Sequence, residues 1–393
     1  MPKLTIAQLE LAGKRVFLRA DLNAPLAGGE VSDDTRLRAV LPTIRYALTA
    51  GAAVVLASHL GRPKGKTAEY SMRPVAERLG ALLGHPVELA SDCVGPETAA
   101  RARTLRPGEI LLLENLRFHP EEEKNDDGFA RQLAELADCY VNDAFAAAHR
   151  AHASIDAITR HLQPAAAGLL MQRELSALGR ILEAPERPLV AVLGGAKVSD
   201  KVALVEHLIG KVDALVIGGG MAFTFLRALG HAIGRSLVEP DRVETARAAL
   251  EAARRRGVPL TLPVDAVVAD GLDSASGRAV SIRQIPDTEM GLDIGPRTVE
   301  RFTAVLATAR TIVWNGPMGV FEKSPFAAGT VAVARAVAAA PAFTVIGGGD
   351  TIAAVNAAGV GDKIGYISTA GGAFLEFLEG RTLPGVAALT EAA

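Results

Sequence analysis

Short apolar runs alternate with alanine-rich segments along the whole chain. In the first half the runs read RVFLRADLN, AAVVLASHLG, EILLLENLRF and CYVNDAF, and in the second half PLVAVLGGAK, ALVIGGG, TIVWNGPMG and FTVIGGGDT. None of these runs alternates apolar with polar positions, so each predicts a strand buried on both faces, as in parallel sheets covered by helices. The pattern predicts an α/β fold of two Rossmann-like domains, each with a parallel sheet flanked by helices.

A segment with helical periodicity separates the two groups of runs. Apolar residues recur at helical spacing from Leu170 to Leu182, and Pro185 ends the pattern. A hinge helix between two domains and an ordinary packed helix both fit this stretch. Because 393 residues are too many for one ordinary core, we expect an N-terminal domain over 1–168, an interdomain hinge helix over 169–184 and a C-terminal domain over 185–382, with the domains facing across a cleft.

The residues that follow the first-half strands are mostly arginines, histidines and short polar side chains. Ligands bind outside the carboxyl ends of strands in open parallel sheets, and arginine presents a planar fork that grips carboxylate or phosphate oxygens in pairs. Each arginine taken singly is better explained as a solvated surface charge, but the position that they share at the strand ends predicts a pocket for a small, highly anionic molecule. His149 and His152 stay ambiguous, and neither is expected to be a catalyst. The set is Arg19, Asp21, Asn23, Arg36, His59, Arg62, Asn115, Arg117, His149, Arg150 and His152.

Glycines follow the second-half strands instead. Glycine lets main-chain N–H groups approach a phosphate without an intervening Cβ, and the helix that follows adds roughly half a positive charge. We call each place where a strand turns through glycines into a helix a glycine corner. Repeated corners of this kind predict a site for a polyphosphate such as a nucleotide, although tight packing of strand against helix also needs glycine. The corners are Gly194–Gly195, Gly218–Gly220, Gly316 with Gly319, Gly347–Gly349 and, near the end, Gly371–Gly372.

Two lysines stand just after the first of these corners, in VLGGAKVSDK. We expect Lys197 and Lys201 to lie one turn apart on one face of a new helix. Like charges at the positive end of a helix destabilise it by a few tenths of a kcal/mol each unless an anion offsets them. A phosphate chain across both lysines is the favoured interpretation, and a solvated helix face is the alternative.

A carboxylate follows another corner, in IGGGDT. Asp350 has two possible roles there. It is placed to hold magnesium, which favours one or two carboxylates plus phosphate oxygens, or to cap the helix that follows. The sequence alone does not decide between them.

Two familiar phosphate-binding motifs are matched only in part, one because of its spacing and one because a glycine is missing. GRPKGKT, at 61–67, is one residue too short for a P-loop. In IGGGMAF and IGGGDTI the third glycine of the dinucleotide fingerprint is replaced by Phe223 and Ile352. A nicotinamide dehydrogenase therefore lacks its main support.

Composition narrows the remaining classes. The net charge of −2 argues against a nucleic-acid partner or an acidic membrane surface. Two cysteines, Cys93 and Cys139, suggest no disulfide framework. The first residues lack a signal-peptide core, and no apolar run approaches the ~18 residues that span a bilayer. We expect a soluble cytoplasmic protein without membrane partners.

Beyond this reasoning, the chain closely resembles the phosphoglycerate kinase family. FLRADLNAP, SHLGRP, LLLENLRF, VNDAF with AHRAHAS, LGGAKVSDK, VWNGPMGVFE, GGGDT and LPGV occur in the family's order between Phe17 and Val386. The resemblance implies transfer of a phosphoryl group between 1,3-bisphosphoglycerate with ADP and 3-phosphoglycerate with ATP, in glycolysis and gluconeogenesis. It also implies a monomer, magnesium as cofactor, and a tail over 383–393 that packs on the N-terminal, phosphoglycerate-binding domain.

The resemblance assigns residues to each part of the reaction. Arg36, Lys197, Gly371 and Gly372 would surround the moving phosphoryl group. Asp350 would hold magnesium, Glu322 the ribose, and Gly291 with Leu292 the adenine. The phosphoglycerate pocket would consist of Asp21, Leu22, Asn23, Arg36, His59, Leu60, Gly61, Arg62, Arg117 and Arg150. The nucleotide contacts would be Lys201, Gly219, Gly220, Gly291, Leu292, Asn315, Glu322, Gly348, Gly349, Asp350 and Thr351.

Two departures from the family pattern stand near these residues. Ala146 and Ala147 replace a usual Gly-Thr pair, and Ala370 replaces the first of three glycines. Neither changes a charged residue of the predicted site. They alter only the backbone freedom expected of a substrate loop and of a phosphate-binding corner.

The acceptor in this reaction is a carboxylate, so no general base is needed. Catalysis should depend on in-line positioning, neutralisation of charge and a domain closure that excludes water. Three rival classes remain: a kinase for an alcohol with Asp21 as base, a two-domain protein that binds an anion without chemistry, and the weakly supported dehydrogenase. A coupled assay with 3-phosphoglycerate, ATP and magnesium separates all of them.

Overall fold

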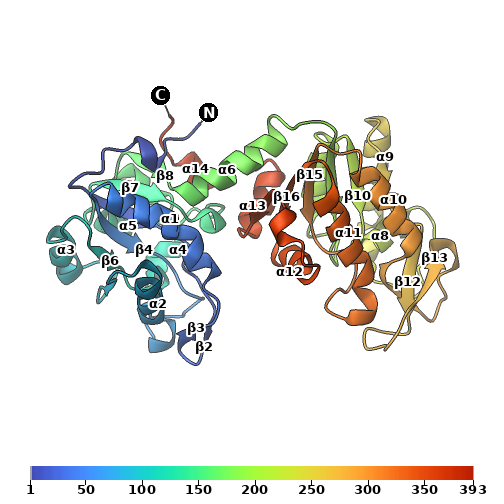
Figure 1. Cartoon of the computed structure of the whole chain (residues 1–393), viewed down its shortest axis with the longest axis horizontal. Helices are drawn as coiled ribbons and strands as arrows, with labels where there is room; N and C mark the ends of the chain where they lie inside the picture. Colours follow the sequence, from blue (N-terminus) through green and yellow to red (C-terminus); the bar gives the residue numbers. More distant parts are fainter. Residues whose placement is uncertain (1, 393) are drawn as a thin grey trace. The chain divides into compact units, whose positions relative to one another are not determined.

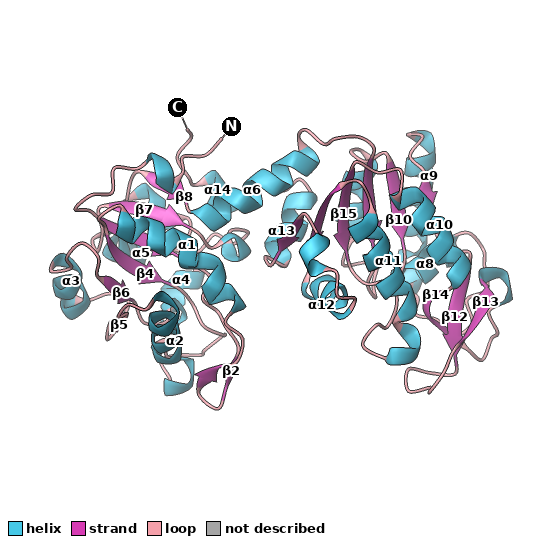
Figure 2. Ribbon diagram, viewed as in Figure 1, coloured by secondary structure: helices cyan, strands magenta, loops and turns pink. Residues whose placement is uncertain are grey.

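The computed structural model describes residues 2–392, which divide into two units. Residues 2–176 together with 382–392 form the first unit, and residues 177–381 form the second. Each unit has a six-stranded sheet of its own, with helices on its faces (Figures 1 and 2). Within the described residues, none of the helices has the length and apolarity needed to cross a membrane.

The sheet of the first unit has the order β5-β6-β4-β1-β7-β8, and every pair in it is parallel. Its strands are β1 (Arg15–Arg19), β4 (Ala53–Ala57), β5 (Glu88–Leu89), β6 (Ile110–Leu112), β7 (Cys139–Asn142) and β8 (Ala165–Ala167), with a separate hairpin of β2 (Leu26–Ala27) and β3 (Glu30–Val31). The helices are α1 (Thr35–Thr49), α2 (Arg73–Leu83), α3 (Pro96–Arg103), α4 (Pro120–Glu123), α5 (Asp127–Ala134) and α14 (Pro384–Ala387).

The end of the chain completes this first unit. The N–H of Leu4 donates to the carbonyl of Thr390 at 2.8 Å, and the N–H of Gly385 donates to the carbonyl of Ala148 at 2.8 Å. Lys3 and Glu391 add an isolated bridge between the first and last residues of the unit. The segment 382–392 is thus bonded both to the start of the chain and to the loop that carries the predicted Arg150.

The second unit has a parallel sheet with the order β11-β10-β9-β15-β16-β17. Its strands are β9 (Leu189–Leu193), β10 (Ala214–Ile217), β11 (Leu260–Thr261), β15 (Thr311–Asn315), β16 (Phe343–Gly347) and β17 (Tyr366–Ser368). The helices are α7 (Val202–Ile209), α8 (Met221–Ala228), α9 (Val243–Arg255), α10 (Pro296–Leu306), α11 (Ala328–Ala339), α12 (Gly349–Ala357) and α13 (Gly372–Leu378).

The apolar runs of the sequence are the inner strands of these sheets. All residues of β4, β9 and β15 are buried, which is the burial expected when helices cover both faces. The expected α/β fold with two helix-flanked parallel sheets is confirmed. Short strands at the sheet margins, β5, β8, β11 and β17, were not expected, because two or three residues carry no readable periodicity.

A third, antiparallel sheet in the second unit was also not expected. Its order is β13-β12-β14, built from β12 (Asp265–Ala269), β13 (Arg278–Ser281) and β14 (Met290–Ile294). No residue of β13 is buried, and β12 and β14 carry the buried carboxylates Asp265 and Asp293. Such strands lack the continuous apolar run that reveals a buried parallel strand. The sequence analysis did not predict this sheet, which the second unit has in addition to its parallel one.

The helical segment in mid-chain is α6 (Leu169–Leu182), which stops before Pro185. Met171, Leu178 and Ile181 are among its buried apolar residues. The Asp143 carboxylate, just beyond β7, accepts the N–H groups of Leu170 and Met171 at 2.8 and 3.0 Å. These bonds satisfy two of the N–H groups that the first turn of a helix leaves without an intrahelical partner.

Candidate active site

The predicted arginine and histidine residues of the first unit lie at one edge of its sheet. Neighbouring parallel strands β6, β4, β1 and β7 end at Leu112, Ala57, Arg19 and Asn142, and their carboxyl ends share that edge. The loops that follow carry the whole predicted phosphoglycerate set, with Arg36 in the first turn of α1. This is the edge at which open parallel sheets bind ligands.

Direct contacts connect three of these loops. Nη1 of Arg36 lies 3.1 Å from a carboxylate oxygen of Asp21 and 3.1 Å from the carbonyl of Asn23. The side-chain oxygen of Asn23 accepts the N–H of Gly61 at 2.8 Å, and Arg117 donates to the carbonyl of Gly61 at 2.7 Å. The residues that the sequence placed together are therefore held together before any ligand binds.

Not every predicted residue offers its side chain. Leu22 and Leu60 are buried in the core, and their N–H groups donate to Ser58 and Asn115 at 2.9 and 3.1 Å. These two leucines shape the loops and do not present a polar group to a ligand. Arg62, in contrast, is exposed on the loop after β4.

The cluster has an excess of positive charge. Burial, followed by the charges of Arg19 and Arg117, holds the pKa of His59 well below its usual range. Burial and the same arginines lower the pKa of His152 to about 4. Both imidazoles are therefore neutral near pH 7, and the guanidinium groups set the field. A small anion is the ligand that this field favours.

Arg150 lies on the loop that contains the Ala146–Ala147 departure. Its Nε donates to Nε2 of His149 at 3.1 Å. Ala147 is buried in a 3-10 turn, Phe145–Ala147, and Asn125 is the one non-glycine residue with positive φ among the described residues. Alanine therefore fits this loop without strain, and the glycine usual in the family is not required by its backbone.

In the second unit the glycine corners have two different roles. A Cβ on Gly194 would lie 2.1 Å from the carbonyl oxygen of Pro317, and one on Gly219 would lie 2.6 Å from the nitrogen of Gly195. These glycines allow loops after neighbouring strands to pack closely. Gly349 and Gly371, however, have no atom within 4 Å of such a Cβ. Their backbones face open space, where a phosphate has access.

The predicted arrangement of Lys197 and Lys201 is wrong. Helix α7 begins at Val202, so Lys201 only precedes it and Lys197 lies in the loop after β9. Val198 is buried, and Ser199 donates to Glu239 through its N–H at 3.0 Å and its hydroxyl at 2.5 Å. These contacts hold 197–201 as a loop, with Lys197 exposed and Lys201 buried.

Lys201 belongs to a polar group at the strand ends. It donates to the side-chain oxygen of Asn315, the last residue of β15, and the amide of Asn315 donates to the carbonyl of Gly347 at 2.7 Å. The hydroxyl of Thr351 accepts the N–H of Gly316 at 2.7 Å. A Cβ on Gly348 would lie 2.7 Å from the side-chain nitrogen of Asn315. Four predicted nucleotide contacts are thus brought together here.

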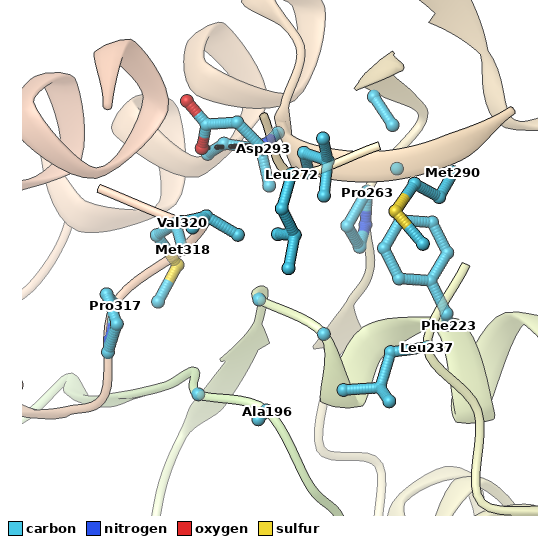
Figure 3. Close-up of a pocket in the computed structure, with 18 of the residues that line it drawn as sticks. Ala196, Phe223, Leu237, Pro263, Leu272, Met290, Asp293, Pro317, Met318 and Val320 are labelled. Carbon is cyan, nitrogen blue, oxygen red and sulfur yellow. Dashed lines mark hydrogen bonds between the residues drawn. The ribbon is translucent and has the colours of Figure 1, made fainter. Parts of the chain in front are cut away.

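The second unit has a pocket of about 390 Å³ (Figure 3). Six other predicted nucleotide residues line it. This volume lies within the range usual for small-molecule sites. Its wall includes Gly219, Gly220, Gly291, Leu292, Glu322 and Asp350. A Cβ on Gly291 would lie 2.0 Å from the ring of Phe223, so this glycine lets the aromatic ring form part of the wall.

Sequence reasoning missed most of the pocket's apolar wall. Leu237 and Leu272 are 46% and 49% exposed, which is unusual for leucine, and both line the pocket. Both are labelled around the cavity, together with Phe223, Met290, Met318 and Val320 (Figure 3). The distinguishing feature of these two leucines is their exposure, and the periodicity of the sequence does not reveal it.

Asp350 lines this pocket and fits a magnesium ligand. It is exposed in the first turn of α12, and Gly348 occupies the N-cap position with no side-chain cap. The alternative that Asp350 caps this helix is therefore wrong. A carboxylate beside open glycine N–H groups suits magnesium bound to phosphate oxygens. When bound, this ion would neutralise charge on the phosphate oxygens.

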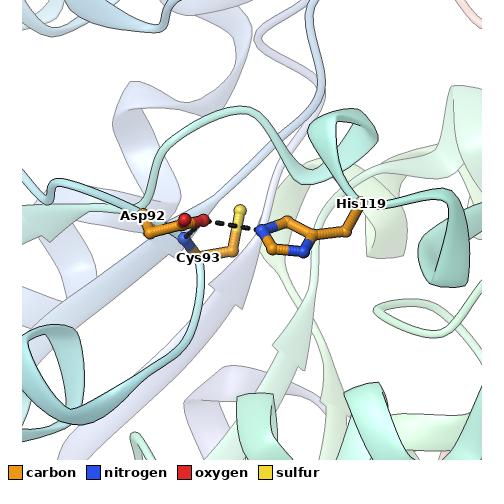
Figure 4. A group of neighbouring side chains, drawn as sticks. All are labelled: Asp92, Cys93 and His119. Atoms are coloured by element: carbon orange, nitrogen blue, oxygen red, sulfur yellow. Dashed lines mark hydrogen bonds and ion pairs between the residues drawn. The ribbon is translucent and has the colours of Figure 1, made fainter. Parts of the chain in front are cut away.

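A second group of metal-ligating side chains lies in the first unit, at Asp92, Cys93 and His119 (Figure 4). Nε2 of His119 is 2.6 Å from Oδ1 of Asp92, and the thiol of Cys93 donates to the carbonyl of Glu114 at 2.9 Å. Burial raises the pKa of this thiol well above its usual value. Each of the three side chains already has a protein partner, so this cluster is explained without a metal.

Comparisons with known proteins agree with the fold and with the motifs. A family model described as phosphoglycerate kinase matches residues 6–381. A phosphoglycerate kinase of Moorella thermoacetica is 59% identical over 393 residues, and one of Acidobacterium capsulatum is 56% identical over 403 residues, each match covering 100% of both chains.

Solved structures give the same result. The phosphoglycerate kinase of Coxiella burnetii has a TM-score of 0.92 at 43% identity, and that of Pyrococcus horikoshii OT3 has a TM-score of 0.84 at 37% identity. Each comparison covers 98% of both chains. The fold class and the resemblance drawn from the motifs are confirmed by these matches. The chain belongs to the phosphoglycerate kinase family.

Proposed function

We propose that this chain transfers a phosphoryl group reversibly between 1,3-bisphosphoglycerate with ADP and 3-phosphoglycerate with ATP, using two separately built half-sites. Family membership makes it a glycolytic phosphotransferase with a carboxyl group as acceptor. One observation carries the assignment of half-sites. The same chain has an arginine-rich cluster at the strand ends of one unit and a glycine-walled pocket at the strand ends of the other.

The first half-site would bind 3-phosphoglycerate. Arg36, Arg62, Arg117 and Arg150 supply positive charge. His59 supplies a polar group whose imidazole stays neutral, because burial and then the charges of Arg19 and Arg117 lower its pKa. The fork of each guanidinium suits the paired oxygens of a phosphate or a carboxylate. Asp21 and Asn23 hold Arg36, and they would orient the carboxyl end of the substrate through it.

The second half-site would bind ADP or ATP. The apolar wall around Gly291 and Leu292 suits a purine, and Glu322 at its rim suits the ribose hydroxyls. The phosphates would extend toward Lys201 and the open backbone of Gly349. We propose Asp350 as the ligand for magnesium, which accompanies the phosphates.

Catalysis would depend on positioning the two substrates and on neutralising the charge of the transferring phosphoryl group. The acceptor carboxylate is already a nucleophile, so the reaction needs no base. Asp21, the base that an alcohol kinase would require, is instead ion-paired with Arg36 at 3.1 Å. We propose that Arg36, Lys197 and the N–H groups of Gly371 and Gly372 neutralise the charge on the transferring group. Since these residues belong to different units, the proposal requires that both units contact the substrates during phosphoryl transfer.

A coupled assay tests the proposed function directly. The chain is incubated with 3-phosphoglycerate, ATP and magnesium, and formation of 1,3-bisphosphoglycerate is followed with a second enzyme that consumes it. D-glycerate, which lacks the phosphate, is the matched substrate control. Turnover with 3-phosphoglycerate, and none with D-glycerate, supports the proposal. Turnover with an uncharged alcohol, or none with 3-phosphoglycerate, would overturn it.

A further inference from the structure

A network of hydrogen-bonded, buried polar groups lies next to the predicted phosphoglycerate pocket. It runs from His59 through Arg19 and Ser154 to Glu122. Arg19 is 1% exposed, Ser154 and Glu122 are 0% exposed, and His59 is 8% exposed. Arg19 was expected among the residues of the anion pocket. The structure instead places its side chain out of solvent, where it contacts other protein groups.

Each link of this network has hydrogen-bond geometry. Nη2 of Arg19 lies 3.1 Å from Nδ1 of His59, and Nε of Arg19 donates to the hydroxyl of Ser154 at 2.8 Å. That hydroxyl donates to Oε1 of Glu122 at 2.6 Å, while Oε2 accepts the N–H of Ser154 at 2.9 Å. The carbonyl of Ser154 accepts the hydroxyl of the buried Tyr140 at 2.8 Å.

The direction of these bonds is fixed by chemistry. A guanidinium has five N–H donors and no acceptor, and it keeps its charge in proteins. Nδ1 of His59 must therefore accept, so it carries no proton. A neutral imidazole has one proton, which then resides on Nε2. In the described part of the chain, Nε2 of His59 has no hydrogen-bond partner of its own, so it is left for a ligand.

We propose that Arg19 is a positioning residue that fixes His59 as its Nε2–H tautomer, so that a neutral imidazole donates one hydrogen bond to the anionic substrate. The ligand identity rests on the proposed function, but the tautomer does not. A free histidine populates both tautomers and becomes cationic in mild acid. Contact with Arg19 removes two of these three states, because both place a proton on Nδ1.

Glu122 offsets the cost of burying the positive charge of Arg19. A buried charge is costly unless it is paired and hydrogen-bonded, and Glu122 is linked to Arg19 through one hydroxyl. The other charged or titratable groups that act on His59 are Arg117, His152 and Arg36. His152 also faces Glu122, with Nδ1 at 3.9 Å from Oε1. The charges of Arg117 and Arg36 oppose the cationic imidazole, whereas the contact of Arg19 with Nδ1 selects between the two neutral tautomers.

The tautomer can be read without any substrate. Long-range ¹⁵N–¹H spectra of the ¹⁵N-labelled full chain distinguish a protonated from an unprotonated ring nitrogen, and His59→Gln assigns the signals. We expect protonated Nε2 and unprotonated Nδ1 for His59 throughout pH 5.5–8. A proton on Nδ1, or titration of His59 to the cation within this range, would overturn the proposal. Absence of kinase activity would contradict the proposed function but leave this reading intact.

Two conservative variants test the donor itself. In His59→Gln the new side-chain amide reaches about as far as Nε2 of the imidazole, whereas in His59→Asn the shorter amide ends near the position of Nδ1. We expect His59→Asn to raise KM for 3-phosphoglycerate about tenfold or more, as for loss of a hydrogen bond to a charged group, and His59→Gln to raise it by much less. Equal losses in both variants would sink the idea that a neutral donor at Nε2 is what the substrate needs.

Arg19→Lys tests the positioning role. Lysine keeps the charge but lacks the fork that bridges Ser154 and His59. We expect mixed His59 tautomers in the spectrum and a higher KM with little change in kcat. If this variant does not fold, Ser154→Ala removes the hydroxyl that accepts from Nε of Arg19, so that the guanidinium is no longer oriented toward His59. A spectrum identical to wild type in Arg19→Lys, or in Ser154→Ala if Arg19→Lys does not fold, would show that the orientation of the guanidinium does not set the tautomer.

Discussion

The ammonium group of Lys201, just before α7, donates a hydrogen bond to the side-chain oxygen of Asn315 at the end of β15. Burial lowers the pKa of Lys201 to about 8, although the nearby carboxylates of Asp200, Asp350 and Glu379 oppose the shift. Lys201 is 8% exposed. A phosphate placed beside this group would favour its charged form.

Nucleotide binding should therefore be linked to protonation of Lys201. Below pH 8 the lysine is already charged, but above pH 8 a bound polyphosphate must draw a proton from solvent. We expect ADP to bind more weakly as pH rises through about 8, with proton uptake near pH 8.5. Calorimetry of ADP binding in buffers of different ionisation enthalpy measures this uptake.

A matched variant isolates the lysine. Lys201→Gln has no proton to gain, so its ADP affinity should be lower at pH 7 and should lose this pH dependence. Lys211→Gln, an exposed lysine at the other end of α7, should behave as wild type. Undiminished proton uptake in Lys201→Gln would assign the linkage to another group.

Lys197 should act on the transferring phosphoryl group and not on folding. It is exposed in a loop that Val198 and Ser199 hold in place. We expect Lys197→Ala to lower kcat by at least ~10²-fold, as for removal of one preorganised donor, with no measurable change in melting temperature. Steady-state kinetics and thermal unfolding check both parts. Turnover within threefold of wild type would make Lys197 a bystander.

Arg36 and Arg117 should fail in different ways. If Arg36 meets the transferring group, Arg36→Ala lowers kcat on the same scale as Lys197→Ala. If Arg117 binds the substrate equally in ground and transition states, Arg117→Ala mainly raises KM for 3-phosphoglycerate. The matched control is Arg38→Ala on the same helix as Arg36, because Arg38 is exposed and paired with Asp34 at 2.7 Å. The same kinetic defect in Arg36→Ala and Arg38→Ala would point to helix α1 and not to the site.

Much of the fold was predictable because its inner strands are buried on both faces. Continuous apolar runs such as the one that ends at Leu193 are typical of that environment, and the rule that ligands bind at strand ends then placed Arg19 and His59 together. The antiparallel sheet and the exposed Leu237 and Leu272 were missed because each depends on tertiary contacts. Lys197 was misplaced because glycine corners lead here into a loop before the helix begins.

Substitutions of two glycines by alanine should distinguish a role in packing, which affects stability, from a role in phosphate binding, which affects turnover. Gly219 has φ +67°, and an added Cβ would lie 2.6 Å from the nitrogen and 2.7 Å from the oxygen of Gly195. Backbone atoms cannot yield as a flexible side chain does, so Gly219→Ala should destabilise the protein by about 2 kcal/mol or more. Gly371 has φ +52° with ψ −106° and an open surrounding, so Gly371→Ala should cost backbone strain of about 1–3 kcal/mol without a steric clash.

Gly371→Ala should lower kcat although it disturbs no packing contact. Gly371 is the N-cap of α13, and its N–H is one of the groups proposed to contact the transferring phosphoryl group. Relaxation of φ toward negative values would turn that N–H away, so Gly371→Ala should lose kcat about tenfold or more while it stays folded. Gly108→Ala, also at positive φ in open space but in the first unit, controls for strain alone. If Gly108→Ala and Gly371→Ala lose equal stability and only the second loses turnover, the backbone of Gly371 acts in catalysis; full activity in Gly371→Ala would remove it from the site.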